Sequence, residues 1–232
     1  MENDKLKLEK KHLIKTLVLA NLCVPLILII SGDFYWKAGW IFAIWLFLYS
    51  SLVPIYLYFK NQELFYERFL RKGASNHRTW DAIFILTFIF LFFIWLIVLG
   101  LDRRFHWSME FPFYLMVLSL FFLTFSVFFS FKSVADNTFA SSVVRMQEDR
   151  KQHVVSTGVY SFVRHPMYLG GVFAYMGAPL LVNSIYGLAM GILFTIMFSL
   201  RILGEERMLE TELEGYKEYE QKVKYRLFPF IW

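Results

Sequence analysis

Long runs without charged residues are the feature that most limits what this chain can fold into. A helix needs about 20 predominantly apolar residues to cross a bilayer. Three uncharged runs reach that length: Ala38–Phe59, Ala82–Leu101 and Phe111–Phe131. A fourth, Leu13–Ile30, contains a single charge, Lys15, near its start, from where a long side chain can reach the membrane surface. We therefore expect a membrane protein.

Two shorter apolar runs follow, Met167–Val182 and Ile185–Leu200, and only Asn183 and Ser184 separate them. Their spacing predicts a helical hairpin whose ends extend into polar sequence. The composition agrees with membrane insertion, because 57% of the residues are hydrophobic and 19% are charged, against roughly 45–50% and about 25% in soluble domains. We predict an all-α, polytopic integral membrane protein with about six transmembrane helices.

The basic residues predict an orientation. All but three of the 24 Lys and Arg residues precede or begin the first run, fill the second and fourth connections, or follow the last run. The exceptions are Lys37, Arg103 and Arg104. Because Lys and Arg concentrate in cytoplasmic loops, we expect both termini and the polar connections to face the cytoplasm. The host membrane would be the inner or plasma membrane in a prokaryote and the endoplasmic reticulum in a eukaryote.

Several classes of site lack a pattern in this sequence. The single cysteine, Cys23, excludes an intrachain disulfide and a multi-cysteine metal site. The histidines have no ligand spacing, so we expect no metal; they are His12, His77, His106, His153 and His165. No Gly-rich phosphate loop or serine nucleophile motif is present. No basic segment alternates with aromatic residues that bind nucleic acid by stacking, so we expect no nucleic-acid partner.

The chain divides by character into residues 1–131, which hold four spans, and residues 132–232, which hold most of the unusual polar residues. We therefore look for candidate functional residues in the second part. The pattern leaves open whether residues 132–157 continue the fourth span or form a separate surface helix.

An anion site is predicted at the start of the hairpin. Pro166 suits the first position of a helix, where its missing N–H costs nothing. His165 would then cap that helix, with Arg164 just outside. Free N–H groups beside cationic side chains bind anions.

Two further polar clusters follow. Arg201 and Glu205 are spaced to share one helix face at the end of the last run, and such charges are costly at a membrane boundary unless paired or hydrated. In the tail, Tyr216 and Tyr219 recur at helical spacing among charges. A helix lying on the membrane surface explains them, and the same helix can also close a site from below.

Taken together, these motifs resemble the isoprenylcysteine carboxyl methyltransferase family over residues 145–232. The matching elements, in chain order, are Gly158-Val-Tyr160, Arg164-His165-Pro166-x-Tyr168-x-Gly170, Arg201-x-x-x-Glu205-Glu206, Gly215-Tyr216-x-x-Tyr219 and Arg226-x-x-Pro229-x-x-Trp232. The resemblance implies an integral-membrane methyltransferase that uses S-adenosylmethionine without a Rossmann domain, with an active site facing the cytoplasm. It also implies that residues 132–232 are the catalytic region, in which the helical hairpin and the C-terminal tail form the cofactor pocket.

The same resemblance implies roles for individual residues. The adenosyl part would contact Gln147, His153, Val154 and Val155, and Tyr160 would line the same pocket. The methionyl end would lie against His165, Pro166 and Tyr168, beside Arg164, and Glu205 would close the pocket. Arg201 matches the arginine on the substrate side.

The expected chemistry needs few catalytic groups. An ionised carboxylate, with a pKa near 4, is already a nucleophile toward a sulfonium methyl group, so the site has to supply mainly alignment and exclusion of water. We expect Arg201 to orient the carboxylate of a lipidic or prenylated acceptor that enters between the spans, among the membrane lipids.

Three alternatives stay open at this point. A phospholipid N-methyltransferase would keep the cofactor but methylate an amine, which has to lose a proton before it attacks. A relative of the sterol reductases would use NADPH, although those proteins tend to be longer. A membrane transporter or sensor subunit would bind no nucleotide cofactor.

Overall fold

The computed structural model describes residues 2–70 and 78–232, with side chains from residue 10 onward. Over these residues it contains helices and no strand. Arg71, Lys72 and His77 lie outside the described residues. The helices are α1 (Glu2–Asn21), α2 (Leu26–Ser31), α3 (Lys37–Lys60), α4 (Gln62–Phe69), α5 (Thr79–Phe105), α6 (Phe113–Asp136), α7 (Pro166–Val182), α8 (Ile185–Glu212) and α9 (Tyr216–Lys222), with short 3-10 turns η1 (Glu148–Arg150) and η2 (Gly158–Ser161).

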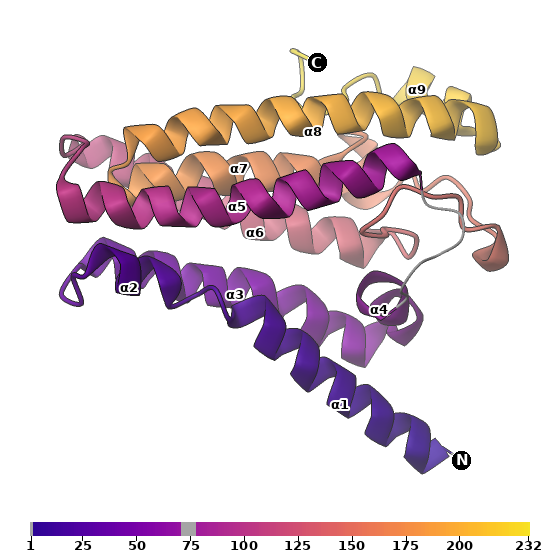
Figure 1. The fold of residues 1–232 in the computed structure, drawn as a ribbon. Helices are drawn as coiled ribbons and strands as arrows, with labels where there is room; N and C mark the ends of the chain where they lie inside the picture. The colour runs from indigo at the N-terminus through magenta and orange to yellow at the C-terminus, as the bar shows by residue number, and fades with distance from the viewer. Residues whose placement is uncertain (1, 71–77) are drawn as a thin grey trace.

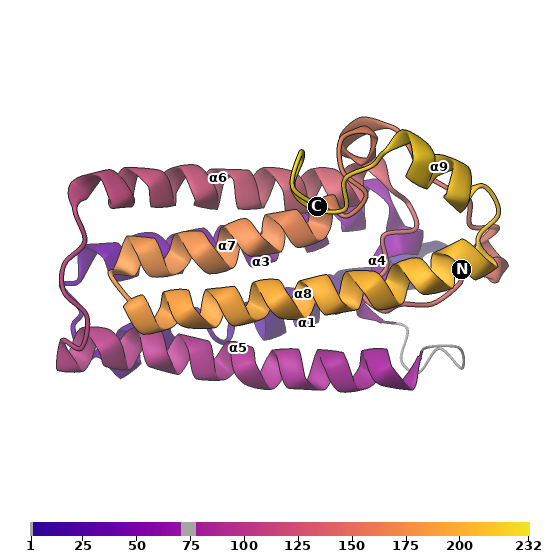
Figure 2. The same cartoon turned by 90° about the horizontal axis from the view of Figure 1, so that it is seen from above.

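The long helices form two layers. Helices α5, α6, α7 and α8 lie side by side in one layer, in the order α6–α7–α8–α5 (Figure 2). Helices α1, α2 and α3 form the other layer (Figure 1). A buried cluster that includes Phe42, Trp95 and Phe194 joins the layers. The C-terminal half of α8, α9, α4 and the 137–165 connection gather at one end of the bundle (Figures 1 and 2).

Five segments are long and apolar enough to cross a membrane: Lys10–Ser31, Lys37–Lys60, Thr79–Phe105, Phe113–Asp136 and Ile185–Glu212. They coincide with five of the predicted spans. The sixth, predicted at Met167–Val182, is the apolar helix α7 of 17 residues, shorter than the roughly 20 residues of a typical span. The chain is thus an all-helical, polytopic membrane protein, as predicted.

The first span is broken, whereas the sequence predicted one continuous helix over Leu13–Ile30. Helix α1 ends at Asn21 and α2 begins after Pro25, which has no N–H to donate to the preceding turn. Polar contacts compensate at the break, because the Asn21 amide donates to Leu17 O (2.8 Å) and to Ser51 Oγ of α3 (3.0 Å).

The predicted hairpin is confirmed as α7 and α8, joined by Asn183 in the left-handed region (φ 60°) and Ser184, whose hydroxyl caps α8 by accepting from Gly187 N (2.9 Å). Helix α8 extends into polar sequence as expected, but α7 does not, because it begins at Pro166. A Cβ at Gly170 would lie 2.4 Å from Ser130 Oγ, so this glycine is what lets α7 approach α6 closely.

The connection between the fourth span and the hairpin has its own structure. Helix α6 continues through Asp136, and the chain then runs without regular structure except for η1 and η2. Residues 132–157 therefore extend the fourth span by one turn and then form a loop. The loop contains no surface helix beyond the three-residue η1.

Candidate functional site

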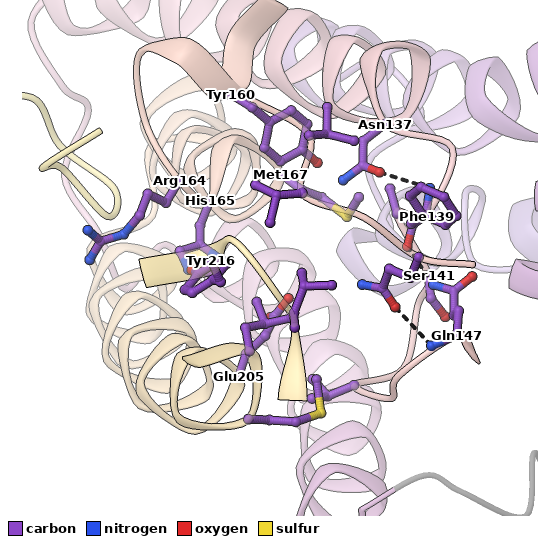
Figure 3. Close-up of a pocket in the computed structure, with 18 of the residues that line it drawn as sticks. Asn137, Phe139, Ser141, Gln147, Tyr160, Arg164, His165, Met167, Glu205 and Tyr216 are labelled. Atoms are coloured by element: carbon purple, nitrogen blue, oxygen red, sulfur yellow. Dashed lines mark hydrogen bonds between the residues drawn. The ribbon is translucent and has the colours of Figure 1, made fainter. Parts of the chain in front are cut away.

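A cavity opens at the end of the bundle where the 137–165 connection meets α7, α8 and α9 (Figure 3). About 850 Å³ of space free of protein atoms lies between the lining residues, and part of this space is open to solvent. The cavity brings together all ten residues predicted to bind the cofactor: Gln147, His153, Val154, Val155, Tyr160, Arg164, His165, Pro166, Tyr168 and Glu205.

The start of α7 is the organising element of this site. Pro166 is its first residue and His165 precedes it as the cap, as predicted. The backbone before α7 pairs with the tail, because Arg164 N donates to Tyr225 O (2.9 Å) and His165 N donates to Arg226 O (2.9 Å). Pro166 disfavours a helical conformation at His165, so α7 begins at the proline, and the two backbone bonds bring the tail against the cavity.

Glu206 of α8 joins the same elements through its carboxylate. Oε1 accepts from Arg164 Nε (2.7 Å) and lies 3.2 Å from His165 Nε2. Oε2 accepts from Arg226 Nε (2.5 Å). Glu206 is 2% exposed, so these charges stabilise one another away from water.

Arg164 uses its guanidinium in this structural network. Nη2 also pairs with Glu220 Oε1 (3.0 Å) and Nη1 donates to Val223 O (3.1 Å). Figure 3 shows its charged end directed away from the cavity. Arg164 therefore holds the tail in place, and the part of it that lines the cavity is not its charged end.

Glu205, the neighbour of Glu206, lines the cavity instead. Its Oε2 accepts from the Tyr168 hydroxyl (2.6 Å), and no described Lys, Arg or His forms an ion pair with it. The sequence placed Arg201 one turn before it on the same face, but the two side chains do not pair. A carboxylate without a cation beside a cavity favours a positively charged ligand.

Tyrosine rings form much of the wall. The Tyr160 hydroxyl donates to Ser133 O (3.2 Å), and the Tyr219 hydroxyl donates to Tyr160 O (2.8 Å). The Tyr216 hydroxyl is buried and has no hydrogen-bond partner. Burial raises the pKa of Tyr160, Tyr216 and Tyr219, so all three are neutral at physiological pH. Of the two roles considered for the tail helix, the structure favours closing the cavity, because Tyr216 and Tyr219 are buried.

The loop side of the cavity is held by Gln147, which is 1% exposed. Its Nε2 donates to Phe139 O (2.7 Å), and its Oε1 accepts from Arg150 Nη1 (2.6 Å). His153 packs edge-on against the Phe139 ring, with centroids 4.9 Å apart. Gln147 and His153 therefore shape the loop as well as lining the cavity.

Gly158 fixes the entry to η2. Its φ is +60°, and a Cβ would lie 2.0 Å from Asp136 Oδ2. That same oxygen accepts from Val159 N (3.0 Å). The close contact with α6 places Tyr160 at the cavity wall.

Arg201 is the one predicted site residue that does not line the cavity. Its Nε donates to Asp81 Oδ1 (2.8 Å) and its Nη2 donates to Ser142 O (3.0 Å). Its guanidinium carbon lies 5.8 Å from the centroid of the Tyr168 ring. Arg201 thus lies outside the cavity, near the Tyr168 ring. Its contact with an acceptor stays a prediction.

Sequence reasoning missed Asp81, which is fully buried and accepts from Val144 N (2.7 Å) as well as from Arg201. A lone acid at the head of an apolar run was the only available sign of it. It also missed much of the lining: Asn137, Phe139, Ala140, Ser141, Val143, Val144, Arg145, Gln152, Met167, Met208, Leu209 and Leu213. Most of these lie in loop segments or are apolar, and they have no motif.

Comparison with known proteins bears on the same region. The sequence profile of the phospholipid methyltransferase family matches residues 114–214, which include α7 and α8, nearly all of α6, and the loop between α6 and α7. The chain is also 31% identical over 85 residues to a protein-S-isoprenylcysteine O-methyltransferase of Schizosaccharomyces pombe. The matched part spans 36% of this chain and 36% of that relative. The family resemblance inferred from the motifs is thereby confirmed: residues 114–214 have the sequence pattern of the phospholipid methyltransferase family.

Proposed function

We propose that this protein transfers the methyl group of S-adenosylmethionine to the carboxylate of a lipidic acceptor in the membrane. The observation that supports the proposal most directly is that one cavity gathers all ten residues expected to bind that cofactor. The similarity to the phospholipid methyltransferase family and to an isoprenylcysteine O-methyltransferase agrees with it.

The residues around the cavity fit this cofactor. Glu205 is a carboxylate without a cationic partner among the described residues, and aromatic faces such as those of Tyr160 and Tyr168 attract cations. The orphaned Tyr216 hydroxyl offers a hydrogen bond that the protein itself does not use. When bound, the cofactor supplies a methyl group that is activated by the positive charge on its sulfur.

The chain's own residues then bind and exclude water. Glu205 and the tyrosine rings hold the positive end, and Tyr216 bonds a polar group of the ligand. The tail, fixed by Glu206 and Arg164, covers the cavity and keeps water from competing as a nucleophile. No general base is needed for a carboxylate acceptor, which agrees with His165 being engaged by Glu206.

A phospholipid amine is the second candidate acceptor, and the family profile that matches residues 114–214 supports it. An amine has to be deprotonated before it attacks, so its methylation rate should rise with pH well above 7. A carboxylate acceptor is ionised throughout this range and should give a flat profile.

Binding of S-adenosylhomocysteine to the purified chain, measured by calorimetry, tests the cofactor assignment. We expect saturable binding that Glu205→Gln and His165→Ala each weaken by at least about tenfold, the usual cost of losing one partner of a buried charged contact. Tyr35→Phe, at a residue 95% exposed and outside the cavity, is the matched control and should bind like the parent. No binding by the parent would refute the proposal.

The acceptor is identified by incubating the protein with methyl-labelled cofactor and either N-acetyl-S-farnesylcysteine or phosphatidylethanolamine vesicles between pH 6 and 9. Base-labile label on the farnesylcysteine, with a flat pH profile, supports the carboxylate acceptor. Label that resists base and appears on phosphatidylethanolamine, at a rate that rises with pH, supports the amine instead.

A further inference from the structure

Arg68, in α4 at the cavity end of the bundle, is a partly buried cation that forms no ion pair with any described residue. Its Nη1 donates to Ala140 O, and its two terminal nitrogens each lie 3.9 Å from Met167 Sδ. Its Nε is buried with no hydrogen-bond partner. Burial lowers the pKa of the Arg68 guanidinium to about 10, which leaves it protonated at neutral pH.

Other arginines of the described chain whose side chains are largely removed from solvent have a carboxylate within reach. Arg145 pairs with Glu67 (2.7 Å), Arg164 with Glu206 (2.7 Å), and Arg201 with Asp81 (2.8 Å). Buried charges are normally paired because taking an unpaired charge out of water is costly. The protein-side partners of Arg68 are a carbonyl and a thioether, both neutral, so its positive charge is available to an anion from outside the chain.

The position of Arg68 connects it to the candidate site. Ala140 and Met167, which its guanidinium contacts, both line the cavity. The Ser142 hydroxyl donates to Arg68 O (3.2 Å), between the lining residues Ser141 and Val143. Figure 1 places α4 in the layer opposite α8. Glu205 lines the cavity, whereas Arg68 lies next to it, in contact with the lining residues Ala140 and Met167.

We propose that Arg68 binds the carboxylate of the methyl acceptor, which rests on the function proposed above. Arg201 would have to give up Asp81 and Ser142 O to do so, whereas the Arg68 Nε has no partner to lose. A guanidinium binds a carboxylate through two parallel N–H donors. Glu205 then faces the sulfonium of the cofactor and Arg68 faces the carboxylate of the acceptor, so the two reacting groups are held away from water.

The charge balance of the transfer gives Arg68 a second consequence. A lone pair of the carboxylate oxygen forms the new O–CH₃ bond, and the S–CH₃ bond breaks with its electron pair staying on sulfur. The products are a neutral ester and a neutral thioether. Because the ester no longer carries a charge, its attraction to Arg68 falls and product release is favoured.

The test measures the affinity of the full-length protein for N-acetyl-S-farnesylcysteine and for the matching carboxamide, with S-adenosylhomocysteine present. We expect the parent to prefer the carboxylate by at least about tenfold and Arg68→Gln to lose that preference. Arg68→Lys, which keeps the charge but not the fork, should retain part of it. Arg104→Gln, at an exposed arginine near the other end of the bundle, is the matched control.

Four results would overturn the inference. The carboxylate preference survives in Arg68→Gln, or the parent shows no such preference. Alternatively, Arg68→Gln weakens S-adenosylhomocysteine binding as much as acceptor binding, which would mean that Arg68 holds the cofactor's own carboxylate. Loss of transfer to phosphatidylethanolamine alone would assign Arg68 to a lipid phosphate. If Arg68→Gln fails to fold, Arg68→Lys provides the comparison.

Failure of the proposed function would be distinguishable from failure of this inference. A parent protein that does not bind S-adenosylhomocysteine refutes the function. A parent that binds it and transfers methyl groups, while Arg68→Gln behaves in every assay like Arg104→Gln, refutes only the role of Arg68.

Discussion

Glu205 and Glu206 are consecutive residues of α8, yet their carboxylates serve different parts of the molecule. Glu205 lines the cavity and accepts one hydrogen bond, from the Tyr168 hydroxyl at 2.6 Å. Glu206 is 2% exposed and binds two arginines and a histidine that hold the tail. Under the proposed function, Glu205 serves ligand binding and Glu206 serves folding, within one turn of helix.

This separation predicts opposite phenotypes for two conservative variants. Glu206→Gln leaves buried Arg164 with only the partly exposed Glu220 as an anion, and we expect a loss of about 3–5 kcal/mol in the free energy of unfolding. Glu205→Gln should change that free energy by less than about 1 kcal/mol, since a partly exposed carboxylate with one hydrogen bond contributes little, while it weakens S-adenosylhomocysteine binding. Thermal unfolding in detergent and calorimetry measure the two effects. Equal destabilisation by both variants would contradict the separation.

A second pair of neighbours on α9 tests the orphaned hydroxyl. Tyr216→Phe removes a buried hydroxyl without a partner, whose desolvation costs about 1–3 kcal/mol. We expect the ligand-free protein to keep or gain stability and S-adenosylhomocysteine to bind up to about tenfold more weakly, because one hydrogen bond is lost.

Tyr219→Phe is the matched control for that variant. Its hydroxyl donates to Tyr160 O at 2.8 Å, so its removal should lower the unfolding temperature by itself. If Tyr216→Phe destabilises the ligand-free protein as much as Tyr219→Phe does, the Tyr216 hydroxyl has a partner after all.

Tyr216 also predicts a pH dependence. Burial raises its pKa in the folded protein, whereas an exposed tyrosine has a pKa of about 10. Below that pH both states hold the proton. Above it the unfolded chain ionises first, so the free energy of unfolding falls by about 1.4 kcal/mol per pH unit for this group.

The difference in unfolding free energy between Tyr216→Phe and the parent isolates this effect. We expect the difference to stay constant from pH 7 to about 9 and then to grow in favour of the variant. Denaturant unfolding at a series of pH values measures it. A difference that is independent of pH up to 11 would show that Tyr216 ionises equally in both states.

The sequence predicted the helices and the residues that line the cavity better than it predicted which side chains bond to one another. Apolar runs define spans whatever they pack against, and Pro166 allows only one start for α7. The partner of Arg201 was unpredictable, because Asp81 lies 120 positions earlier in the chain and only the packing of α5 against α8 brings them together. The proposed role of Arg68 was unpredictable for the same reason. An arginine in a connection between spans is expected to be solvated until the structure shows that it is partly buried.

A substitution at Gly158 tests whether the contact between α6 and the 137–165 connection positions Tyr160 at the cavity wall. An alanine there meets both a left-handed backbone, at a cost of roughly 1–2 kcal/mol, and Asp136 Oδ2, which would lie 2.0 Å from the new Cβ. Because η2 must then shift, Tyr160 leaves the cavity wall, and we expect Gly158→Ala to weaken S-adenosylhomocysteine binding as well as stability. Gly32→Ala is the control, since Gly32 has a φ of +66° and nothing within 4 Å of a Cβ. It should lose stability from the backbone alone and bind the ligand like the parent, whereas equal binding by both variants would mean that Asp136 yields without moving Tyr160.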